Sequence, residues 1–598
     1  MINTFCKTPL YECTKTLSAV AIGKEKADLV IRGANLINVC THEILENIDV
    51  AVSMGRIALV GNASHCIGEK TKVVDATGKH LAPAFMDGHI HIESSMLTAQ
   101  EYARAVVPHG TSGIFFDPHE ICNVVGLKGV KCMMKDIKTT PLKGMMTTPS
   151  CVPAVPGFED TGSEISPSDV AETMKWDACA GLGEMMNFPG ILSSDERTHT
   201  ICGETLKSGK TITGHYSVPD TKEGLNSYIA SGIRCCHEST TEMSALTKMR
   251  LGMYAMLREG SAWKDLAEVA KAVTKHEIDT RFACLVTDDS HPHTLMNSGH
   301  LDHVVRRAVE EGIDVVSAIQ MVTINVATCF GLDQELGSIA PSKCADMVLI
   351  SDLNTLNIEE VYIDGELVAK DGKPLFNRSS YQYPAELKNT VHLNKITKDD
   401  LLISANGHKN TARVHVIEVI SGKTSTFDKL IDFPVYDDEL KADGKKDILK
   451  VCVFERHHNT GTIGKGFVKG FGIKDGALAQ TVAHDAHNLL VVGSNDDDMV
   501  LAANTLIECG GGLVAVKDGK ILALVPLPIA GLMSEQPVEE AEKQVGKLEK
   551  AWKDLGSSLP SPFMTMSIIS LACLPELRIT NRGLVDCRTF SFLNLIEE

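Results

Sequence analysis

The sequence predicts an α/β protein in which a (β/α)8 barrel is accompanied by a small β domain and a C-terminal α/β domain. Three observations lead to this prediction. Residues 81–340 alternate short apolar strands with helical patterns, over a length that suits eight strand–helix units. Strand-and-turn patterns occur on both sides of that region, and about 200 further residues follow them. A chain of 598 residues also exceeds the usual size of one domain.

The small β domain is expected to combine both flanks of the barrel. Residues 1–80 contain an N-terminal segment and then three strand-like stretches, with Gly33, Gly55 and Gly78 at the turns. Residues 341–385 return to the same pattern of short strands and glycine-containing turns. The economical interpretation is one β domain built from two segments that are distant in the sequence.

Residues 81–340 are assigned to the barrel itself. Apolar stretches such as GTSGIFFD and FACLVTD have the length and composition of buried parallel strands. Helical patterns lie between the strands, and one of them places five apolar residues on a single face: Leu301, Val304, Val305, Ala308 and Val309. A polar stretch near 380–400 indicates a linker, and residues 400–598 are assigned to the C-terminal domain.

The composition limits the partners that the protein can have. Lys and Arg number 58 against 77 Asp and Glu, which gives a net charge of −19 and argues against nucleic acid or an anionic membrane as partner. No stretch approaches the roughly 18–20 apolar residues of a membrane span, and the N-terminus lacks the apolar core of a signal peptide. The 18 Cys include no CxxC pair, so most are expected to be buried thiols. We therefore expect a cytoplasmic protein that acts on a small molecule.

The most informative motif is the pair His89 and His91, which follows the apolar stretch LAPAFM. Alternate side chains of a strand point to the same side, so both imidazoles would project together from one strand end. His-x-His is common and carries little weight alone. In this chain, however, polar residues recur at the ends of the other candidate strands.

These further strand ends carry carboxylates and imidazoles. In a (β/α)8 barrel the C-terminal strand ends meet at one mouth, where catalytic groups lie. Four His, one Glu and one Asp at that mouth would suit two divalent metal ions. In chain order the strand ends carry Asp117, His119 and Glu120, then Glu184, His215, His237 with Glu238, and Asp288 with Asp289.

Each of these residues also has a simpler structural interpretation. His215 or His237 alone would more often be a hydrogen-bonded structural histidine. Glu184 could cap the following segment, and Asp288 with Asp289 could begin a turn. The metal site is favoured because a suitable residue occurs at the end of nearly every candidate strand.

The motifs together resemble the amidohydrolase superfamily and, within it, the bacterial adenine deaminases. The similar stretches include DGHIHIESSMLT, GLGEMMNFPG and TDDSHP in the barrel. The C-terminal third is the more specific part, in VAHDAHNLLVVGSNDDDM and ECGGGLVAVKDGK. The resemblance covers nearly the whole chain.

The resemblance implies hydrolytic deamination of adenine to hypoxanthine and ammonia, as in purine salvage. It implies two divalent metal ions per chain, Mn²⁺ or Fe²⁺ with Zn²⁺ as an alternative, and a metal-bridged hydroxide that attacks C6 of the purine. It assigns the metal ligands to six residues: His89, His91, Glu184, His215, His237 and Asp288. A homo-oligomer is also expected, with a dimer favoured.

The remaining roles follow from the same resemblance. Asp288 is expected to accept the hydroxide proton and deliver it to the departing amine. Glu120 is the candidate that protonates the purine ring, and Glu93 and Glu238 compete for this role. The residues assigned to substrate binding are Asp289, His119 and Glu238.

Two departures from the family pattern bear on the substrate rather than on the reaction. Tyr216 and then Ser217 follow His215, where the family places one residue and then Pro, and Ser290 stands where the family has Arg. The segment His484-Asp485-x-His487 is expected to shape the pocket or a domain contact, and a further metal site is the alternative. Other functions stay open: deamination of guanine, cytosine or N6-substituted adenine, hydrolysis of a cyclic amide, and a non-catalytic scaffold.

Overall fold

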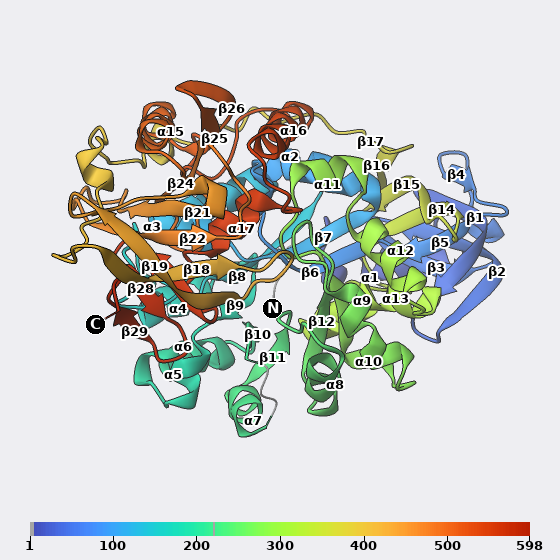
Figure 1. Ribbon diagram of the computed structural model, residues 1–598. Helices are drawn as coiled ribbons and strands as arrows, with labels where there is room; N and C mark the ends of the chain where they lie inside the picture. The colour runs from blue at the N-terminus through green and yellow to red at the C-terminus, as the bar shows by residue number, and fades with distance from the viewer. Residues whose placement is uncertain (1–4, 219–221, 598) are drawn as a thin grey trace.

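The computed structural model describes residues 5–218 and 222–597, and a parallel barrel lies at its centre (Figure 1). Within these residues, eight strands follow one another around the barrel, and each pairs in parallel with the next. They are β6 (Phe85–Ile90), β7 (Thr111–Phe116), β8 (Lys143–Thr148), β9 (Cys179–Met185), β10 (Thr211–Gly214), β11 (Ile233–Cys236), β12 (Tyr254–Arg258) and β13 (Ala283–Val286). The sequence prediction of a (β/α)8 barrel is confirmed.

The barrel closes where β13 meets β6. Ile90 and Asp288 form a parallel bridge, and the Asp288 amide donates a 3.1 Å hydrogen bond to the His89 carbonyl. The residues of β6 and β9 are buried along their whole length, as expected for strands covered on both faces. Closure therefore brings the first and last strand ends, with their polar residues, into contact.

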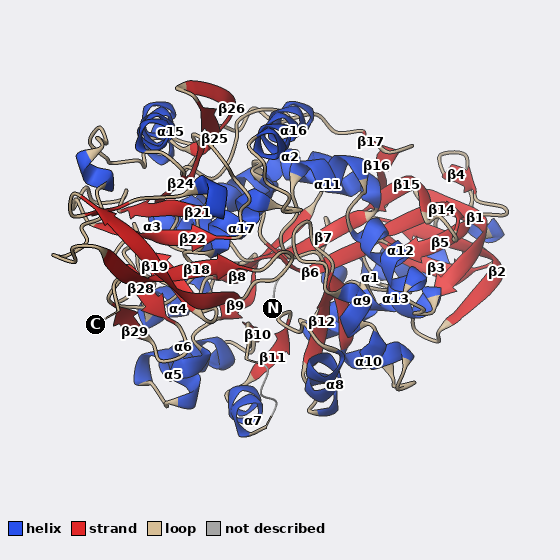
Figure 2. Ribbon diagram, in the orientation of Figure 1, coloured by secondary structure: helices blue, strands red, loops and turns tan. Residues whose placement is uncertain are grey.

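Helices surround the barrel on its outer side (Figure 2). They include α2 (Ala99–Val106), α3 (His119–Ile137), α6 (Glu196–Lys207), α7 (Glu223–Ala230), α8 (Glu242–Arg250) and α12 (Leu301–Glu310). The apolar face predicted for α12 is buried except at its edge, where Val309 is exposed. Val309 follows the well-buried Ala308 by one residue, which turns it about 100° away from the barrel.

The small β domain joins both flanks of the barrel in one sheet. Strand β5 (His80–Pro83), which leads into the barrel, pairs antiparallel with β14 (Met347–Asp352), which follows it. The other members are β1 (Leu29–Asn38), β2 (Glu43–Ser53), β3 (Arg56–Gly61), β4 (Lys72–Asp75), β15 (Asn357–Ile363), β16 (Glu366–Lys370) and β17 (Lys373–Pro374). Helix α1 (Leu10–Ala21) packs against this sheet, and Cys6 and Cys344 form a disulfide between the two flanks.

The C-terminal domain is built on a second, mixed sheet. Its strands are β18 (Thr411–Val419), β19 (Thr426–Tyr436), β20 (Glu439–Leu440), β21 (Ile448–Phe454), β22 (Ile463–Lys469), β23 (Ala477–Gln480), β24 (Leu489–Gly493), β25 (Gly512–Lys517) and β26 (Lys520–Pro526). Helices α15 (Asp496–Cys509), α16 (Val538–Asp554) and α17 (Pro562–Ile568) accompany it. A short sheet of β27 (Leu577–Thr580), β28 (Gly583–Asp586) and β29 (Ser591–Leu593) completes the domain.

The C-terminal domain is seated on the barrel, on the side away from the small β domain (Figure 1). Asn488 of this domain donates a 2.9 Å hydrogen bond to the Asp160 carbonyl, and Arg582 forms an ion pair with the Asp160 carboxylate. Buried apolar residues of both domains belong to one continuous core. Among the described residues, no helix combines the length and the apolar character needed to cross a bilayer.

Candidate active site

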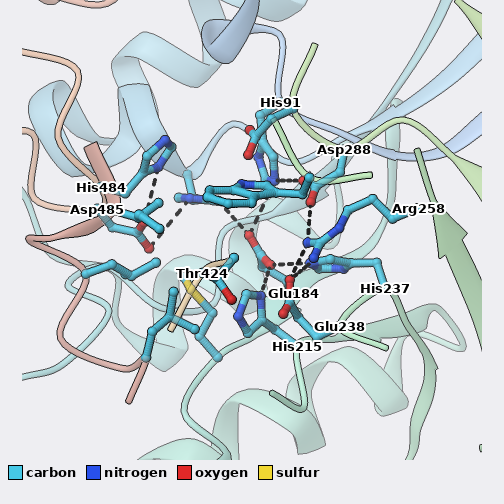
Figure 3. Close-up of a pocket in the computed structure, with 17 residues that line it drawn as sticks. His91, Glu184, His215, His237, Glu238, Arg258, Asp288, Thr424, His484 and Asp485 are labelled. Carbon is cyan, nitrogen blue, oxygen red and sulfur yellow. Dashed lines mark hydrogen bonds and ion pairs between the residues drawn. The ribbon is translucent and has the colours of Figure 1, made fainter. Parts of the chain in front are cut away.

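A cavity of about 50 Å³, lined mostly by buried residues, lies between the barrel mouth and the C-terminal domain (Figure 3). The barrel provides one side of it and the C-terminal domain the other. The residues that line it are His91, His119, Glu184, Met186, His215, His237, Glu238, Arg258, Trp263, Asp288 and Asp289 from the barrel region, and Thr424, His484, Asp485, Ile568, Leu571 and Leu574 from the C-terminal domain.

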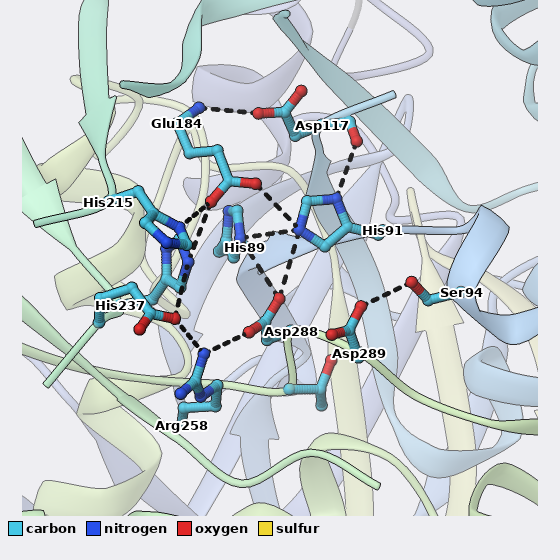
Figure 4. Close-up of polar contacts among 12 residues, drawn as sticks. His89, His91, Ser94, Asp117, Glu184, His215, His237, Arg258, Asp288 and Asp289 are labelled. Carbon is cyan, nitrogen blue, oxygen red and sulfur yellow. Dashed lines mark hydrogen bonds and ion pairs between the residues drawn. The ribbon is translucent and has the colours of Figure 1, made fainter. Parts of the chain in front are cut away.

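His89 and His91 occupy the end of β6 and meet at the centre of the site (Figure 4). Their Nε2 atoms are 3.1 Å apart. His91 Nδ1 donates a 3.0 Å hydrogen bond to the Asp117 carbonyl, which fixes the ring and leaves Nε2 as the free lone pair. The strand alternation expected from His-x-His therefore does bring both imidazoles to one point.

Glu184, near the end of β9, contacts four imidazoles of the barrel region. Its Oε2 lies 2.6 Å from His215 Nδ1 and 3.1 Å from His237 Nε2, while its Oε1 lies 3.3 Å from His119 Nδ1 and 3.5 Å from His91 Nε2. The Glu184 amide donates a 2.7 Å hydrogen bond to Asp117 Oδ2. Gly183 makes this contact sterically feasible, because a Cβ there would lie 2.2 Å from the same oxygen.

Asp288, just beyond β13, divides its two oxygens between imidazoles and a cation. Oδ1 lies 3.3 Å from His91 Nε2 and 3.5 Å from His89 Nε2. Oδ2 accepts a 2.8 Å hydrogen bond from Arg258, the last residue of β12. Arg258 also pairs with Glu238 and, at 2.8 Å, with Asp265. The six predicted metal ligands are thus brought together, and Arg258 orients one of them.

The buried charges shift each other's ionisation. Burial opposes the charged imidazolium, but Glu238 and Glu184 raise the pKa of His215 to about 9. Burial, together with His89, lowers the pKa of His237 to about 4. Burial would raise the pKa of the Glu238 carboxyl, but Arg258 above all lowers it to about 2. Glu238 is therefore an ionised acceptor at neutral pH.

The donor set fits a divalent metal. The nitrogen and oxygen atoms of His89, His91 and Asp288 lie within 4.8 Å of one another, as do those of His89, Glu184 and His237. His215 Nε2 is buried without a hydrogen-bond partner. Imidazole nitrogens and carboxylate oxygens that converge in this way are typical ligands of Mn, Fe and Zn.

The other predicted residues fall into two groups. Asp289, His119 and Glu238, which were assigned to substrate binding, line the cavity. Glu120, the predicted proton donor, is fully buried but does not line it. The Ser94 hydroxyl connects the two groups, since it lies 2.7 Å from Glu120 Oε1 and 2.6 Å from Asp289 Oδ1.

Other residues singled out in the sequence lie outside the cavity. Tyr216 and Ser290 are buried next to His215 and Asp289 in the chain, but neither lines the cavity. In the segment His484-Asp485-x-His487, the first two residues line it and His487 does not. His487 Nδ1 instead accepts a hydrogen bond from the Ala483 amide at 3.2 Å.

Sequence reasoning missed several residues of the site. Arg258 could have been found, because the strand YAMLR ends in a charged residue as its neighbours do. Asp117 is recognisable in the sequence as a strand end, but its support of Glu184 and His91 depends on the closed barrel. Thr424, Ile568 and Leu574 carry no local pattern that points to the cavity.

The barrel and its converging histidines and carboxylates define a metal-dependent amidohydrolase. Comparison with protein families agrees with this class: the amidohydrolase family matches residues 80–368, and the adenine deaminase C-terminal domain matches residues 423–591.

Full-length relatives refine the assignment. An adenine deaminase from Clostridium botulinum is 63% identical over 600 residues, which is 100% of both chains. Adenine deaminases from Moorella thermoacetica and Roseobacter denitrificans are 52% and 46% identical, covering 99% and 97% of both chains. The chain belongs to the adenine deaminase family, as the sequence motifs predicted, and it is a hydrolytic enzyme of the aminohydrolase type.

Solved structures give a weaker likeness. A β-aspartyl dipeptidase from Fervidobacterium islandicum aligns with 59% of this chain and 100% of its own, at 17% identity and a TM-score of 0.45.

Proposed function

We propose that this enzyme hydrolyses adenine to hypoxanthine and ammonia in the cavity at the barrel mouth. The observation that carries the proposal is the convergence of six histidine and carboxylate side chains at the barrel mouth, five of which line the cavity, in a chain similar to adenine deaminases over its full length. The amidohydrolase family makes a divalent metal part of this chemistry.

We further propose that two divalent ions, Mn²⁺ or Fe²⁺, bind here, with Zn²⁺ as the alternative. Their ligands would be His89, His91, Glu184, His215, His237 and Asp288. When bound, such ions lower the pKa of water and supply a nucleophile for C6 of the purine. Because Glu184 contacts imidazoles on both sides, it is the candidate carboxylate for a bridging position.

Asp288 is the proposed proton carrier. Its Oδ2 is held by Arg258 at 2.8 Å, so Oδ1 keeps a fixed direction toward His91 and the cavity. A carboxylate fixed in this way can take a proton from the nucleophile and return it to the amine that leaves C6. Arg258 is a positioning residue in this scheme, because it acts through Asp288 and Glu238.

Asp289, His119 and Glu238 are proposed to bind the purine. Glu238 is ionised and can accept a hydrogen bond from a purine N–H or from the amine. Burial, with Asp288 second, raises the pKa of Asp289 to about 6, so a protonated Asp289 can donate to a ring nitrogen. Glu120 is proposed to supply that proton through Ser94, rather than by direct contact.

Other amidohydrolase reactions make different demands on the site. Enzymes that open cyclic amides often use a carboxylated Lys as metal bridge, and no Lys lines the cavity in the described part of the chain. Deamination of guanine, cytosine or N6-substituted adenine would use the same metal ligands and the same proton carrier. Only a comparison of substrates distinguishes these reactions from the deamination of adenine. The expected cytoplasmic location rests on the composition of the sequence. The expected homodimer is a separate prediction, and light scattering would test it.

The experiment is ammonia release from a panel of bases by purified protein whose metal content has been measured. We expect adenine to be the preferred substrate and about two transition-metal ions per chain. Preferred turnover of guanine, cytosine or a cyclic amide would contradict the proposed substrate. Full activity in protein free of transition metal would contradict the proposed chemistry.

A further inference from the structure

The C-terminal side of the cavity presents Asp485, a buried carboxylate that forms ion pairs with His119 and His484 but whose Oδ2 receives no hydrogen bond. Asp485 lies between β23 and β24 and is 1% exposed. Its Oδ1 is 3.4 Å from His484 Nδ1, and its Oδ2 is 3.6 Å from His119 Nε2. Oδ2, His119 Nε2 and His484 Nε2 are all buried without a hydrogen-bond partner. Figure 3 shows His484 and Asp485 together on one side of the pocket, opposite Arg258.

The Oδ2 atom of Asp485 is expected to receive its hydrogen bond from a donor on the bound ligand. A buried carboxylate oxygen that receives no hydrogen bond is costly, and native proteins satisfy nearly all their buried polar atoms. Asp485 lines the cavity, so a ligand there can reach it. An acceptor-only carboxylate requires an N–H or O–H from that ligand.

The chemistry of adenine supplies the donor at a suitable place. The proposed metal ligands fix the position of C6, because the reaction takes place there. The free base carries an N–H on its five-membered ring, and N9 is the ring nitrogen more distant from C6. A nucleoside has no N–H at this position, because the sugar replaces the hydrogen.

The aliphatic part of the C-terminal wall suits the free base as well. Ile568, Leu571 and Leu574 line the cavity beside Asp485. These side chains offer no partner for the hydroxyl groups of a ribose, and burying unpaired hydroxyls is unfavourable.

Resting on the proposed function, we propose that Asp485 is a specificity-determining residue that accepts a hydrogen bond from the N9–H of the free base. The C-terminal domain then selects bases over nucleosides, while the barrel performs the reaction. A site built around a hydrogen bond can reject a ligand that lacks the donor by a factor of about 10⁴.

The same atoms would also suit a cation, and this is the competing explanation. His119, His484 and Asp485 place one ligand atom each within 4.8 Å of the others. A metal bound there would make Asp485 a ligand instead of a substrate contact. Metal content and substrate preference separate the two roles.

The test compares adenine and 9-methyladenine as substrates of the full-length metal-loaded enzyme and of Asp485→Asn. We expect the wild-type enzyme to favour adenine by about 10⁴ in kcat/KM. The variant should lose about 100-fold on adenine, mainly through a raised KM, because a hydrogen bond to a charged group contributes about 1.5–3 kcal/mol. Its kcat/KM for 9-methyladenine should stay nearly equal to that of the wild type. The ratio of kcat/KM for adenine to kcat/KM for 9-methyladenine should therefore fall about 100-fold.

Asp160→Asn is the matched control. Asp160 lies at the same domain interface and pairs with Arg582 and Asn581, but it does not line the cavity. We expect this variant to keep the wild-type preference. Equal losses on both substrates in Asp485→Asn, or a preference that does not change, would overturn the inference, as would the loss of one metal ion per chain. If the wild-type enzyme released no ammonia from adenine, the proposed function would fail instead.

Discussion

The two sides of the cavity are built on different principles. On the barrel side, the charged groups are paired with one another: Glu184 faces four imidazoles within 3.5 Å, and Asp288 is held by Arg258. On the C-terminal side, three aliphatic residues line the cavity together with Asp485, which is ion-paired with His484 and His119 but whose Oδ2 receives no hydrogen bond. We propose that the barrel side is organised before a substrate arrives, whereas a hydrogen bond from the substrate completes the C-terminal side. Reaction and selection are therefore expected to respond to different substitutions.

The largest effect should come from removing a central ligand on the barrel side. His91→Ala would delete the imidazole that contacts His89, Glu184 and Asp288. We expect turnover of adenine to be abolished and metal content to fall, measured by ammonia release and elemental analysis. His109→Ala, which removes an imidazole paired with Asp302 outside the cavity, is the control. A His91→Ala enzyme with normal metal content and turnover would exclude the proposed site.

Asp288→Asn should reduce kcat by about 10³-fold, within the range for loss of a positioned acid–base group. The amide keeps the shape of the side chain but cannot carry the proton. Asp302→Asn provides the comparison, since Asp302 is also buried and paired with Arg306 but lies outside the cavity. The measurement is steady-state kinetics on protein of equal metal content. A kcat near that of wild type would remove Asp288 from its proposed role.

Arg258→Lys should lower kcat/KM by about 10–100-fold, the usual cost of losing a group that orients a ligand. Lys keeps the charge but cannot hold Glu238, Asp265 and Asp288 at once, because it lacks the planar fork of Arg. Arg306→Lys, at an ion pair outside the cavity, is expected to retain activity. If both variants behave alike, Arg258 has no special function in orienting the site.

Metal affinity should rise with pH. In the metal-free protein, Glu238 and Glu184 overcome the effect of burial and raise the pKa of His215 to about 9, so below that pH a proton competes with the metal for this imidazole. Between pH 6 and pH 8 the apparent Kd should therefore fall by roughly tenfold per pH unit for each displaced proton. Metal titration of the apo-enzyme at several pH values tests this. An affinity independent of pH would exclude His215 as a ligand that must lose a proton.

The smallest effect is expected on the apolar wall of the C-terminal side. Leu571→Ala should raise the KM for adenine by about 10-fold and leave kcat and metal content nearly unchanged, because it removes about 1–3 kcal/mol of apolar contact with the base. Leu559→Ala, at an equally buried leucine outside the cavity, controls for general loss of stability. A large fall in kcat would show that the wall takes part in the reaction and would break the contrast between the two sides.

The two sides of the cavity also differ in how far the local sequence predicts their residues. The barrel ligands lie where apolar strands end, and a parallel barrel brings all such ends to one mouth. His89, Glu184 and Asp288 could be selected on this rule alone. Arg258 obeys the same rule at the end of β12 and was missed because a single terminal Arg also suits a solvated strand end. The role proposed for Glu120 could not be predicted from the sequence, because it depends on the contacts through which Ser94 joins Glu120 to Asp289.

The sequence by itself determined the barrel, the flanking β domain and the six candidate ligands, because strand and helix periodicity and strand-end chemistry are local properties of the chain. Only the tertiary structure decided which oxygen of Asp288 meets Arg258, that Asp117 supports Glu184 and His91, and that Asp485 rather than His487 faces the cavity. Asp485 follows His119 by more than 360 residues. Contacts across such a separation depend on how two domains pack, and no periodicity within either domain encodes that arrangement.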